Sequence, residues 1–426
     1  MPQEIKLESL DLAAIIRDGD HIVWGQGAGE PDTLVEKLLE QRHRIGHASV
    51  FLGGVRSRRT LQHEHADVLN FTSLSAIGSL RGFARDGLLR IVPCHLSQIP
   101  GYFERGIFPA DVVFVQLSEL DARGEYSFAL GHDFQLAAMK RARVVIAEVN
   151  DQVPWTWCDG GVDLSLIDYI VRTSRPPVEI RAQALGPVEQ AIARHVGRYI
   201  EDGTTIQIGV GAIPDAVLAS VGDRRDLGFH SGLISDRVAD LMECGVMTNA
   251  RKPLDPGIAA AGCLVGTRRL YNFSHCNPSI RLFTPSYIHN PLVLGRLGKI
   301  VALNSAIEVD LTGQINAEVA AGAYIGAVGG QVDFVRGAQI SPAGHSIIAL
   351  PASARDDAIS RIVARLEDGV VTTARSDADI IVTEFGAAEL RGQPLAERVR
   401  RMVAISHPNH RERLEREAHE IVQRGG

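Results

Sequence analysis

The sequence is poor in the features that mark several large classes of protein. Its 426 residues include only five cysteines, none in Cys-x-x-Cys spacing: Cys94, Cys158, Cys244, Cys263 and Cys276. This pattern indicates neither a disulfide framework nor a zinc site. Lys and Arg number 44 against 51 Asp and Glu, which gives a net charge of −7. We therefore expect no basic surface for nucleic acid.

Long hydrophobic runs are also missing. No stretch approaches the roughly 20 apolar residues that a membrane-spanning helix needs. The opening MPQEIKLESLDLAAI lacks the basic segment and apolar core of a secretory leader. We therefore expect a cytoplasmic protein that does not bind membranes. At this length the chain can form two or three domains, each with its own core.

Two stretches of the chain read nearly the same. Residues 16–27 are IRDGDHIVWGQG and residues 200–211 are IEDGTTIQIGVG, and ELDARG at 119–124 is answered by EVDLTG at 308–313. In each half a turn leads into an apolar run, glycines and a helical pattern, at 31–39 and 214–221, which is typical of an α/β sheet. The sequence predicts two similar α/β domains from an internal duplication, 1–185 and 186–426, with the active-site cleft between them.

Two further segments predict helices. The stretch from Gly186 to Tyr199 has Pro187 at its start and an apolar face, and it opens the second half. Residues 390–423 are arginine-rich and helical in period, and we expect their charges to be solvated.

A glycine-rich segment, YIGAVGGQVDF at 324–334, carries candidate binding groups. The spacing of Gly326, Gly329 and Gly330 lets consecutive backbone N–H groups point at one oxyanion or phosphate. Gly209 and Gly211 offer backbone contacts of the same kind. Taken alone, an ordinary glycine-rich turn is the simpler interpretation.

Several motifs follow one another along the chain. They are GVGAIPDAV, LGFHSGLISD, CNP, NSAIEVDLTGQ, GAVGGQVDFVRGA and VTEFGAAELRG, with LSQIPGYFERGIFPADVVFVQLSELDARGEYS and AEVN in the first half. Together they resemble the acetyl-CoA hydrolase/transferase family, which includes acetate and 4-hydroxybutyrate CoA-transferases. The resemblance implies coenzyme A or acyl-CoA as substrate, a small-molecule acceptor, no metal and a homo-oligomer. It also implies that the acyl-CoA thioester is bound by Gly209, Gly211, Ile213, Gly326, Gly329, Gly330, Gln331 and Asn277.

The chain departs from this family at its central residue. In the family a glutamate attacks the acyl thioester, and CoA converts the resulting anhydride into a glutamyl-CoA thioester. That glutamate belongs to a His-Ser/Thr-Glu motif, whereas this chain reads His230-Ser231-Gly232. Glycine has no side chain, so position 232 can form neither intermediate.

Three interpretations follow. In the first, which we favour, the acyl group passes directly to water, an amine, an alcohol or a thiol, with the glycine loop as oxyanion hole. In the second, another carboxylate preserves transferase chemistry. The candidates are Glu30, Glu125, Glu308 and Glu384, and Glu125 stands out because the family more often has an aromatic residue there. In the third, the protein binds an acyl-CoA or a partner subunit without chemistry.

The candidate catalytic residues are thus Gly232, His230, Ser231 and Glu125, and two of them also have a structural interpretation. His230 has the near-neutral pKa of a general base, although histidine is a framework residue of the motif. Ser231 is either a nucleophile or, more simply, the cap of a helix or turn.

Other side chains invite functional roles that simpler interpretations outweigh. Cys276 is more simply a small apolar residue beside a turn than a reactive thiol. Arg56, Arg58 and Arg59 could grip the phosphates of CoA, but loop arginines are usually solvated. His407 and His410 have no ligand partners at metal-binding spacing.

Overall fold

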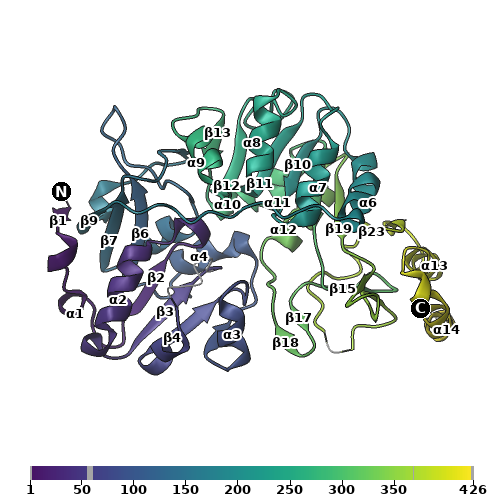
Figure 1. Cartoon of the computed structure of the whole chain (residues 1–426), viewed down its shortest axis with the longest axis horizontal. Helices are drawn as coiled ribbons and strands as arrows, with labels where there is room; N and C mark the ends of the chain where they lie inside the picture. The colour runs from purple at the N-terminus through teal and green to yellow at the C-terminus, as the bar shows by residue number, and fades with distance from the viewer. Residues whose placement is uncertain (1, 55–60, 368, 424–426) are drawn as a thin grey trace. The chain divides into compact units, whose positions relative to one another are not determined.

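The computed structural model describes residues 2–54, 61–367 and 369–423. The chain divides into two compact units (Figure 1). Unit 1 contains Met1–Arg181, Leu233–Asp236 and Ala260–Ile288, and unit 2 contains Ala182–Gly232, Arg237–Ala259 and His289–Gly426. Segments of the second half therefore belong to unit 1, and the division of the chain at residue 185 stays a prediction.

Unit 1 is built on an eight-stranded parallel sheet in the order β1-β9-β7-β6-β2-β3-β4-β5. These strands are β1 (Gln3–Glu4), β2 (His21–Trp24), β3 (Ala48–Leu52), β4 (Leu69–Ser73), β5 (Leu89–Ile91), β6 (Val112–Ser118), β7 (Val144–Asn150) and β9 (Tyr169–Thr173). Helices α1 (Leu12–Ile15), α2 (Asp32–Ile45), α3 (Leu80–Arg85), α4 (Ile99–Glu104) and α5 (Gln135–Met139) connect them. The unit also holds β8 (Trp157–Cys158), α9 (Arg268–Ser274), β13 (Ile280–Leu282), α10 (Pro285–Ile288) and most of β12 (Ala259–Leu264).

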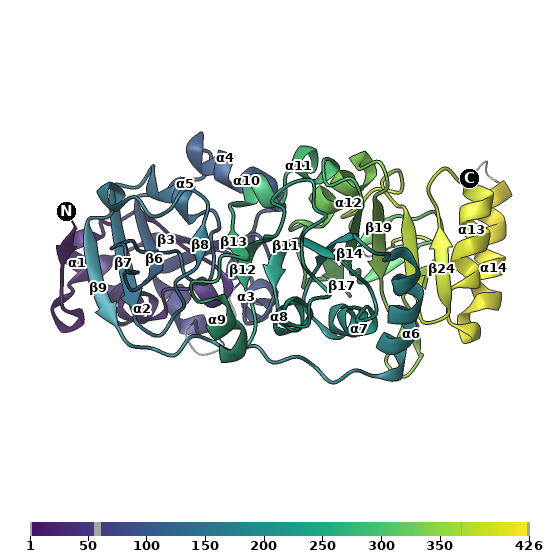
Figure 2. The ribbon, with the colours of Figure 1, turned by 90° about the horizontal axis from the view of Figure 1, so that it is seen from above.

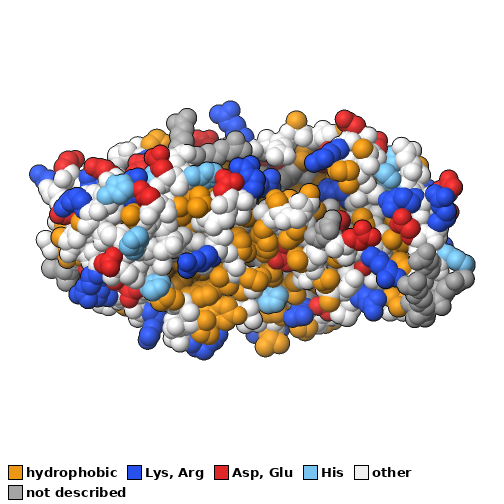
Figure 3. Space-filling view, turned by 90° about the horizontal axis from the view of Figure 1, so that it is seen from below, with side chains coloured by type: hydrophobic (Ala, Val, Ile, Leu, Met, Phe, Trp, Pro, Cys, Tyr) orange, Lys and Arg blue, Asp and Glu red, His pale blue; other side chains and the backbone are white. Residues whose placement is uncertain are grey.

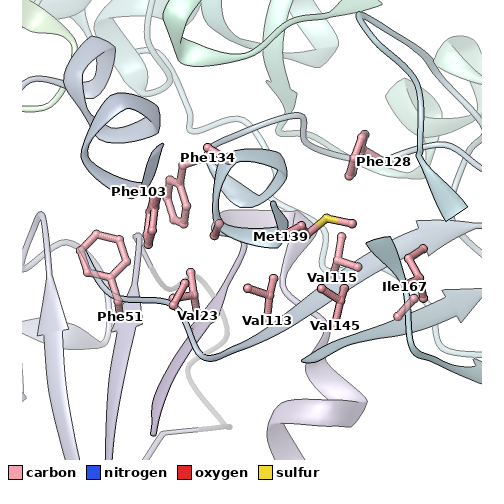
Figure 4. Packing of buried hydrophobic residues seen from close by; sticks show 14 of the residues in the cluster. Val23, Phe51, Phe103, Val113, Val115, Phe128, Phe134, Met139, Val145 and Ile167 are labelled. Carbon is pink, nitrogen blue, oxygen red and sulfur yellow. The ribbon is translucent and has the colours of Figure 1, made fainter. Parts of the chain in front are cut away.

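The core of unit 1 follows from strands that are covered on both faces. Strand β6 reads VVFVQLS and each of its residues is buried, as in parallel sheets with helices on either side. Side chains alternate along a strand, so Val113 and Val115 share a face. There they pack in one cluster with Phe103 of α4 and Phe134, the N-cap of α5, and the two phenylalanine ring centroids lie 5.7 Å apart (Figure 4).

Unit 2 repeats this architecture. Its main strands run in the order β24-β23-β19-β14-β10-β11, and all of the pairs from β23 to β11 are parallel. They are β10 (Thr205–Ile208), β11 (Gly228–Ile234, of which 228–232 belong to this unit), β14 (Ile300–Asn304), β19 (His345–Ala349), β23 (Ile380–Thr383) and β24 (Gly386–Glu389). Figure 2 shows α7 (Ala212–Ser220) and α8 (Asp236–Glu243) on one side of these strands, and α11 (Pro291–Gly295) and α12 (Gln331–Ile340) on the other.

Short ribbons follow β14 in unit 2. Strands β15 (Glu308–Asp310), β16 (Ile315–Asn316) and β22 (Ile362–Val363) form a three-stranded sheet. Two-stranded ribbons are formed by β17 (Val319–Ala320) with β18 (Ala323–Tyr324), and by β20 (Ser353–Ala354) with β21 (Ile359–Ser360). The turn between β18 and α12 carries the glycine-rich segment.

The duplication is visible in hydrogen bonds that both halves share. Asp18 accepts the N–H of His47 and Asp202 accepts the N–H of Arg225, and the glycine after each aspartate has a positive φ, +86° and +72°. Asp121 accepts the N–H groups of the residues two and four positions later, and Asp310 does the same, at 2.9–3.0 Å. Strands β2 and β10 also hold matching places, each between two parallel neighbours. The two α/β halves are therefore built alike.

The helix expected at 186–199 is confirmed as α6 (Pro187–Val196) with a further turn to Tyr199. The segment 390–423 was expected to be helical with solvated charges, and this is only partly correct. It begins beside β24 and forms two helices, α13 (Leu395–Ala404) and α14 (Pro408–Gln423), with proline opening the second. Arg398 is buried and donates to the carbonyls of Thr312 and Arg375.

Helices α11 and α12 approach closely through two glycines. A Cβ on Gly337 would lie 2.4 Å from the Cβ of Leu294, and one on Gly295 would lie 2.4 Å from Ile340. These distances are shorter than real Cβ contacts, so the pair of helices can be this close only where side chains are absent.

We expect Gly337→Ala to destabilise the protein. Overpacking costs about 1–3 kcal/mol, and the better helix propensity of alanine returns only about 1 kcal/mol. Chemical denaturation measures the difference. Gly222→Ala is the matched control because a Cβ there meets nothing within 4 Å, and it should change the free energy of unfolding by less than about 0.5 kcal/mol. Equal stability of the two variants would contradict the prediction.

Candidate active site

The carboxyl end of β10 opens into a glycine turn. Gly211 is the N-cap of α7 and has a φ of +135°, which favours glycine, and Ile213 in the first turn is buried. A Cβ on Gly209 would meet nothing within 4 Å, so this stretch of backbone is open on its side-chain face. A turn of this kind exposes N–H groups at the positive end of a helix and can stabilise an anion there.

The His230-Ser231-Gly232 motif lies within β11, beside the end of β10. His230 is fully buried, and the Ser231 hydroxyl donates to the carbonyl of Ile208 at 2.8 Å. The expectation that Ser231 caps a helix or turn is wrong, because it lies in a strand and ties that strand to its neighbour. Through Ile208 the motif is joined directly to the glycine turn at 209–211.

The base of β11 is held by buried polar groups that sequence reasoning missed. Asn249 accepts the N–H of Phe229 at 2.7 Å, and the Lys252 ammonium donates to the carbonyls of Phe229 and Ile258 at 2.9 and 2.7 Å. Burial lowers the pKa of Lys252 to about 8. No local sequence pattern indicates a role for Asn249 or Lys252. Both hold β11 at Phe229, the residue directly before the motif.

The second glycine turn leads into α12. A Cβ on Gly326 would lie 1.9 Å from the carbonyl oxygen of Ala317, so only glycine fits there, and Gly329 has a φ of +56°. Gly330 is the N-cap of α12. Gln331, the first residue of the helix, is buried and donates to the Thr373 hydroxyl at 3.1 Å. The turn thus ends, like the first one, at the N-terminus of a helix.

One histidine brings these two parts of the sequence together. His289 is buried, and a Cβ on Gly232 would lie 3.1 and 3.2 Å from its Cε1 and Nε2 atoms. A Cβ on Gly330 would lie 2.3 and 2.4 Å from its Nδ1 and Cε1 atoms. The imidazole ring therefore lies against both glycines. Sequence reasoning missed it, because nothing in YIHNP marks a functional residue.

Three other candidates lie in unit 1. Glu125 lines a cavity of about 410 Å³ and pairs with Arg123 at 2.9 Å. Asn277 is engaged at both ends, donating to the Phe273 carbonyl and accepting the N–H of Ser279. Cys276 is exposed with a φ of +54°. All three belong to unit 1, whereas Gly232 belongs to unit 2.

Two of the three remaining carboxylates accept hydrogen bonds in local structure. Glu308 accepts a hydrogen bond from the Asn316 amide at 2.9 Å, and Glu384 accepts the N–H of Ala352 at 2.9 Å. Glu30 is buried in unit 1, where its carbonyl accepts from Gln116.

Other predicted features fall elsewhere. Arg56, Arg58 and Arg59 lie outside the described residues. His407 pairs with the Asp357 carboxylate, and the His410 ring is bonded to the Asp357 carbonyl.

Within the described ranges no cluster of three metal-ligating side chains occurs, and no helix has the length and apolar character of a membrane span. On the face drawn in Figure 3, the described Lys and Arg side chains are interspersed with acidic ones.

This geometry defines a class of protein. In unit 2 of the duplicated α/β fold, glycine turns lead into the N-termini of α7 and α12, and the first of them follows the carboxyl end of the parallel strand β10, where α/β proteins bind anionic ligands. Residues 4–180 match the N-terminal domain, and residues 266–418 the C-terminal domain, of acetyl-CoA hydrolase/transferase. The chain belongs to the acetyl-CoA hydrolase/transferase family, and it is an acyl-CoA transferase or thioester hydrolase of that family.

Relatives match over nearly the whole chain. A 4-hydroxybutyrate coenzyme A transferase of Clostridium kluyveri is 38% identical over 94% of this chain and 94% of its own length. RipA from Yersinia pestis superposes with a TM-score of 0.93 at 31% identity, covering 98% of this chain and 97% of its own. The structure of a 4-hydroxybutyrate CoA-transferase from Porphyromonas gingivalis superposes with a TM-score of 0.83 at 30% identity, covering 99% of this chain and 98% of its own. The α/β fold expected from the sequence is confirmed, while the interdomain cleft and the site residues stay predictions.

Proposed function

We propose that the enzyme transfers the acyl group of an acyl-CoA directly to an acceptor, water included, and forms no covalent intermediate at position 232. The observation that carries this proposal is Gly232 itself. It occupies the third position of the motif, where the family has its glutamate nucleophile. A residue without a side chain cannot attack a thioester, so the acceptor must reach the acyl carbon directly.

The surroundings of Gly232 support direct transfer over a replacement carboxylate. Within unit 2, the side chain that lies against Gly232 is the imidazole of His289. Glu308 and Glu384 of the same unit each accept a hydrogen bond in a neighbouring turn. Among the described residues, no carboxylate atom lies within 4 Å of the place that a Cβ on Gly232 would take.

Hydrolysis illustrates the chemistry. The water oxygen forms a bond to the acyl carbon, and the carbonyl electrons move onto the carbonyl oxygen. When this tetrahedral adduct collapses, the C–S bond breaks, and the CoA thiolate takes up a proton released by the water. The products are a carboxylic acid and free CoA. N–H groups aimed at the developing oxyanion lower the barrier by a few kcal/mol, without any covalent step.

The test follows the fate of acyl and CoA groups. The purified protein is incubated with acetyl-, butyryl- and 4-hydroxybutyryl-CoA, with and without isotopically labelled acetate. We expect free CoA to appear, no labelled acetyl-CoA, and no CoA adduct in the intact mass of the protein. If water is a poor acceptor, added amines, alcohols and thiols should accelerate CoA release.

Two outcomes would overturn this proposal. Labelled acetyl-CoA together with a protein adduct would establish CoA transfer between carboxylates, which the high similarity to CoA-transferases favours as the second candidate. Glu125→Gln, Glu308→Gln and Glu384→Gln variants would then locate the replacement. Binding of acyl-CoA without turnover of any acceptor would establish a binding protein.

A further inference from the structure

His289 occupies the space beside the missing glutamate. Its ring presents Nε2 and Cε1 toward Gly232 and presents Nδ1 and Cε1 toward Gly330. The ring centroid lies 4.7 Å from that of Phe334, one turn into α12. A side chain at either glycine would displace the ring, so both glycines and the histidine form one packed arrangement.

The position of the ring is fixed by the close pair of helices. His289 lies two residues before Pro291, which opens α11, and Gly330 lies directly before α12. Gly337 and Gly295 let these helices pack closely, and the His289 ring itself contacts Gly330 at the start of α12. The ring is therefore placed by rigid elements.

Two properties of the imidazole suit it to a reacting site. It is 5% exposed, and its Nδ1 atom is buried without a hydrogen-bond partner. Burial lowers its pKa to about 3, so the ring is neutral. A neutral imidazole has one N–H donor and one free nitrogen, and a donor in a water-excluded site interacts strongly with an anion.

We infer that His289 stands in for the missing side chain at position 232 and donates the hydrogen bond that the thioester carbonyl oxygen receives in the reaction. This inference rests on the proposed direct acyl transfer. As the acceptor adds to the acyl carbon, negative charge grows on the carbonyl oxygen and the imidazole N–H stabilises it. The ring keeps its proton throughout, and the N–H bond does not break. The proton that the acceptor loses goes to the departing thiolate.

A purely structural role makes a different prediction. If the ring only fills the space beside Gly232 and Gly330, a phenylalanine of similar shape should preserve turnover. If the ring donates a hydrogen bond, glutamine should retain part of the activity because its amide can donate, while phenylalanine and alanine should not.

The test compares His289→Phe, His289→Ala and His289→Gln in CoA release from the acyl-CoA that the wild type turns over fastest. We expect kcat to fall about 100-fold or more in the Phe and Ala variants, with KM changed far less, because the interaction forms mainly in the transition state. His289→Gln should keep at least tenfold more activity than His289→Ala. Added imidazole should restore part of the activity of the Ala variant. The exposed His43→Ala is the control and should match the wild type.

Thermal unfolding and acyl-CoA binding establish that each variant is folded. A folded His289→Phe with wild-type kcat would overturn the inference and leave direct acyl transfer standing. Equal losses in all three variants, without rescue by imidazole, would also overturn it. Failure of the proposed function has a separate signature, which is labelled acetyl-CoA and a CoA adduct in the wild-type protein.

Discussion

Asp133→Asn should stabilise the protein at pH 8 by about 2–4 kcal/mol and flatten the pH dependence of its stability. Asp133 is buried in unit 1. Burial raises its pKa from 3.8 to about 7, against the smaller opposing effects of hydrogen bonds from the Phe134 backbone and the Gln26 side chain. The carboxyl group is therefore costly to ionise in the folded protein.

The sign follows from proton binding. Between pH 3.8 and 7 the folded protein keeps the Asp133 proton while the unfolded chain has lost it. The folded state then binds more protons, so the free energy of unfolding decreases as pH rises through this window. Each pKa unit is worth about 1.4 kcal/mol, which sets the limit near 4 kcal/mol. Asparagine cannot ionise, so the variant should lose this slope and match the wild type near pH 4.

Tryptophan fluorescence during denaturation measures the unfolding of the unit that contains Asp133. The three tryptophans, Trp24, Trp155 and Trp157, all belong to unit 1, as does Asp133. The exposed Asp151→Asn serves as control and should follow the wild type within about 0.5 kcal/mol at every pH. Parallel curves for Asp133→Asn and the wild type from pH 4 to 8 would contradict the prediction.

The duplicated fold could be predicted because its signal is local. The Asp18-Gly19 and Asp202-Gly203 turns share both their sequence and their hydrogen bonds. Few residue types can supply a side-chain acceptor followed by a backbone with positive φ, so the shared turn requires a similar sequence. The sequence could not predict that Leu233–Asp236 and Ala260–Ile288 belong to unit 1, because this depends on how segments far apart in sequence pack together.

The candidate site was predictable only where backbone geometry demands glycine. Gly211, Gly326 and Gly329 follow that rule. His289 could not be found in this way. Its place in the site depends on Gly232 and Gly330, which are far from it in sequence and whose lack of side chains leaves room for its ring. Ser231 was expected to cap a helix or turn, because serine hydroxyls often bond to nearby backbone, yet here it binds the backbone of a neighbouring strand.

Gly232→Glu alone should not restore a glutamyl-CoA intermediate, whereas Gly232→Glu combined with His289→Ala should. A Cβ at position 232 comes within 3.1 Å of the His289 ring, and on its other side the ring already lies against Gly330. To admit a Cβ at position 232 the ring must shift by a few tenths of an ångström, and its contact with Gly330 opposes that shift, so we expect a glutamate to be held out of the productive orientation. The crowding should also destabilise the single variant by about 1–3 kcal/mol.

Removing the imidazole opens the space that a carboxylate needs. With the double variant we expect a CoA adduct in the intact protein mass after incubation with acetyl-CoA, and labelled acetyl-CoA when labelled acetate is present. Gly232→Gln with His289→Ala is the matched control, because an amide of the same size cannot form the anhydride. An adduct of equal yield in the Gly232→Glu single variant would show that ring and carboxylate do not compete. If competition holds, histidine and glutamate are mutually exclusive occupants of one place, and the chemistry of the site depends on which one fills it.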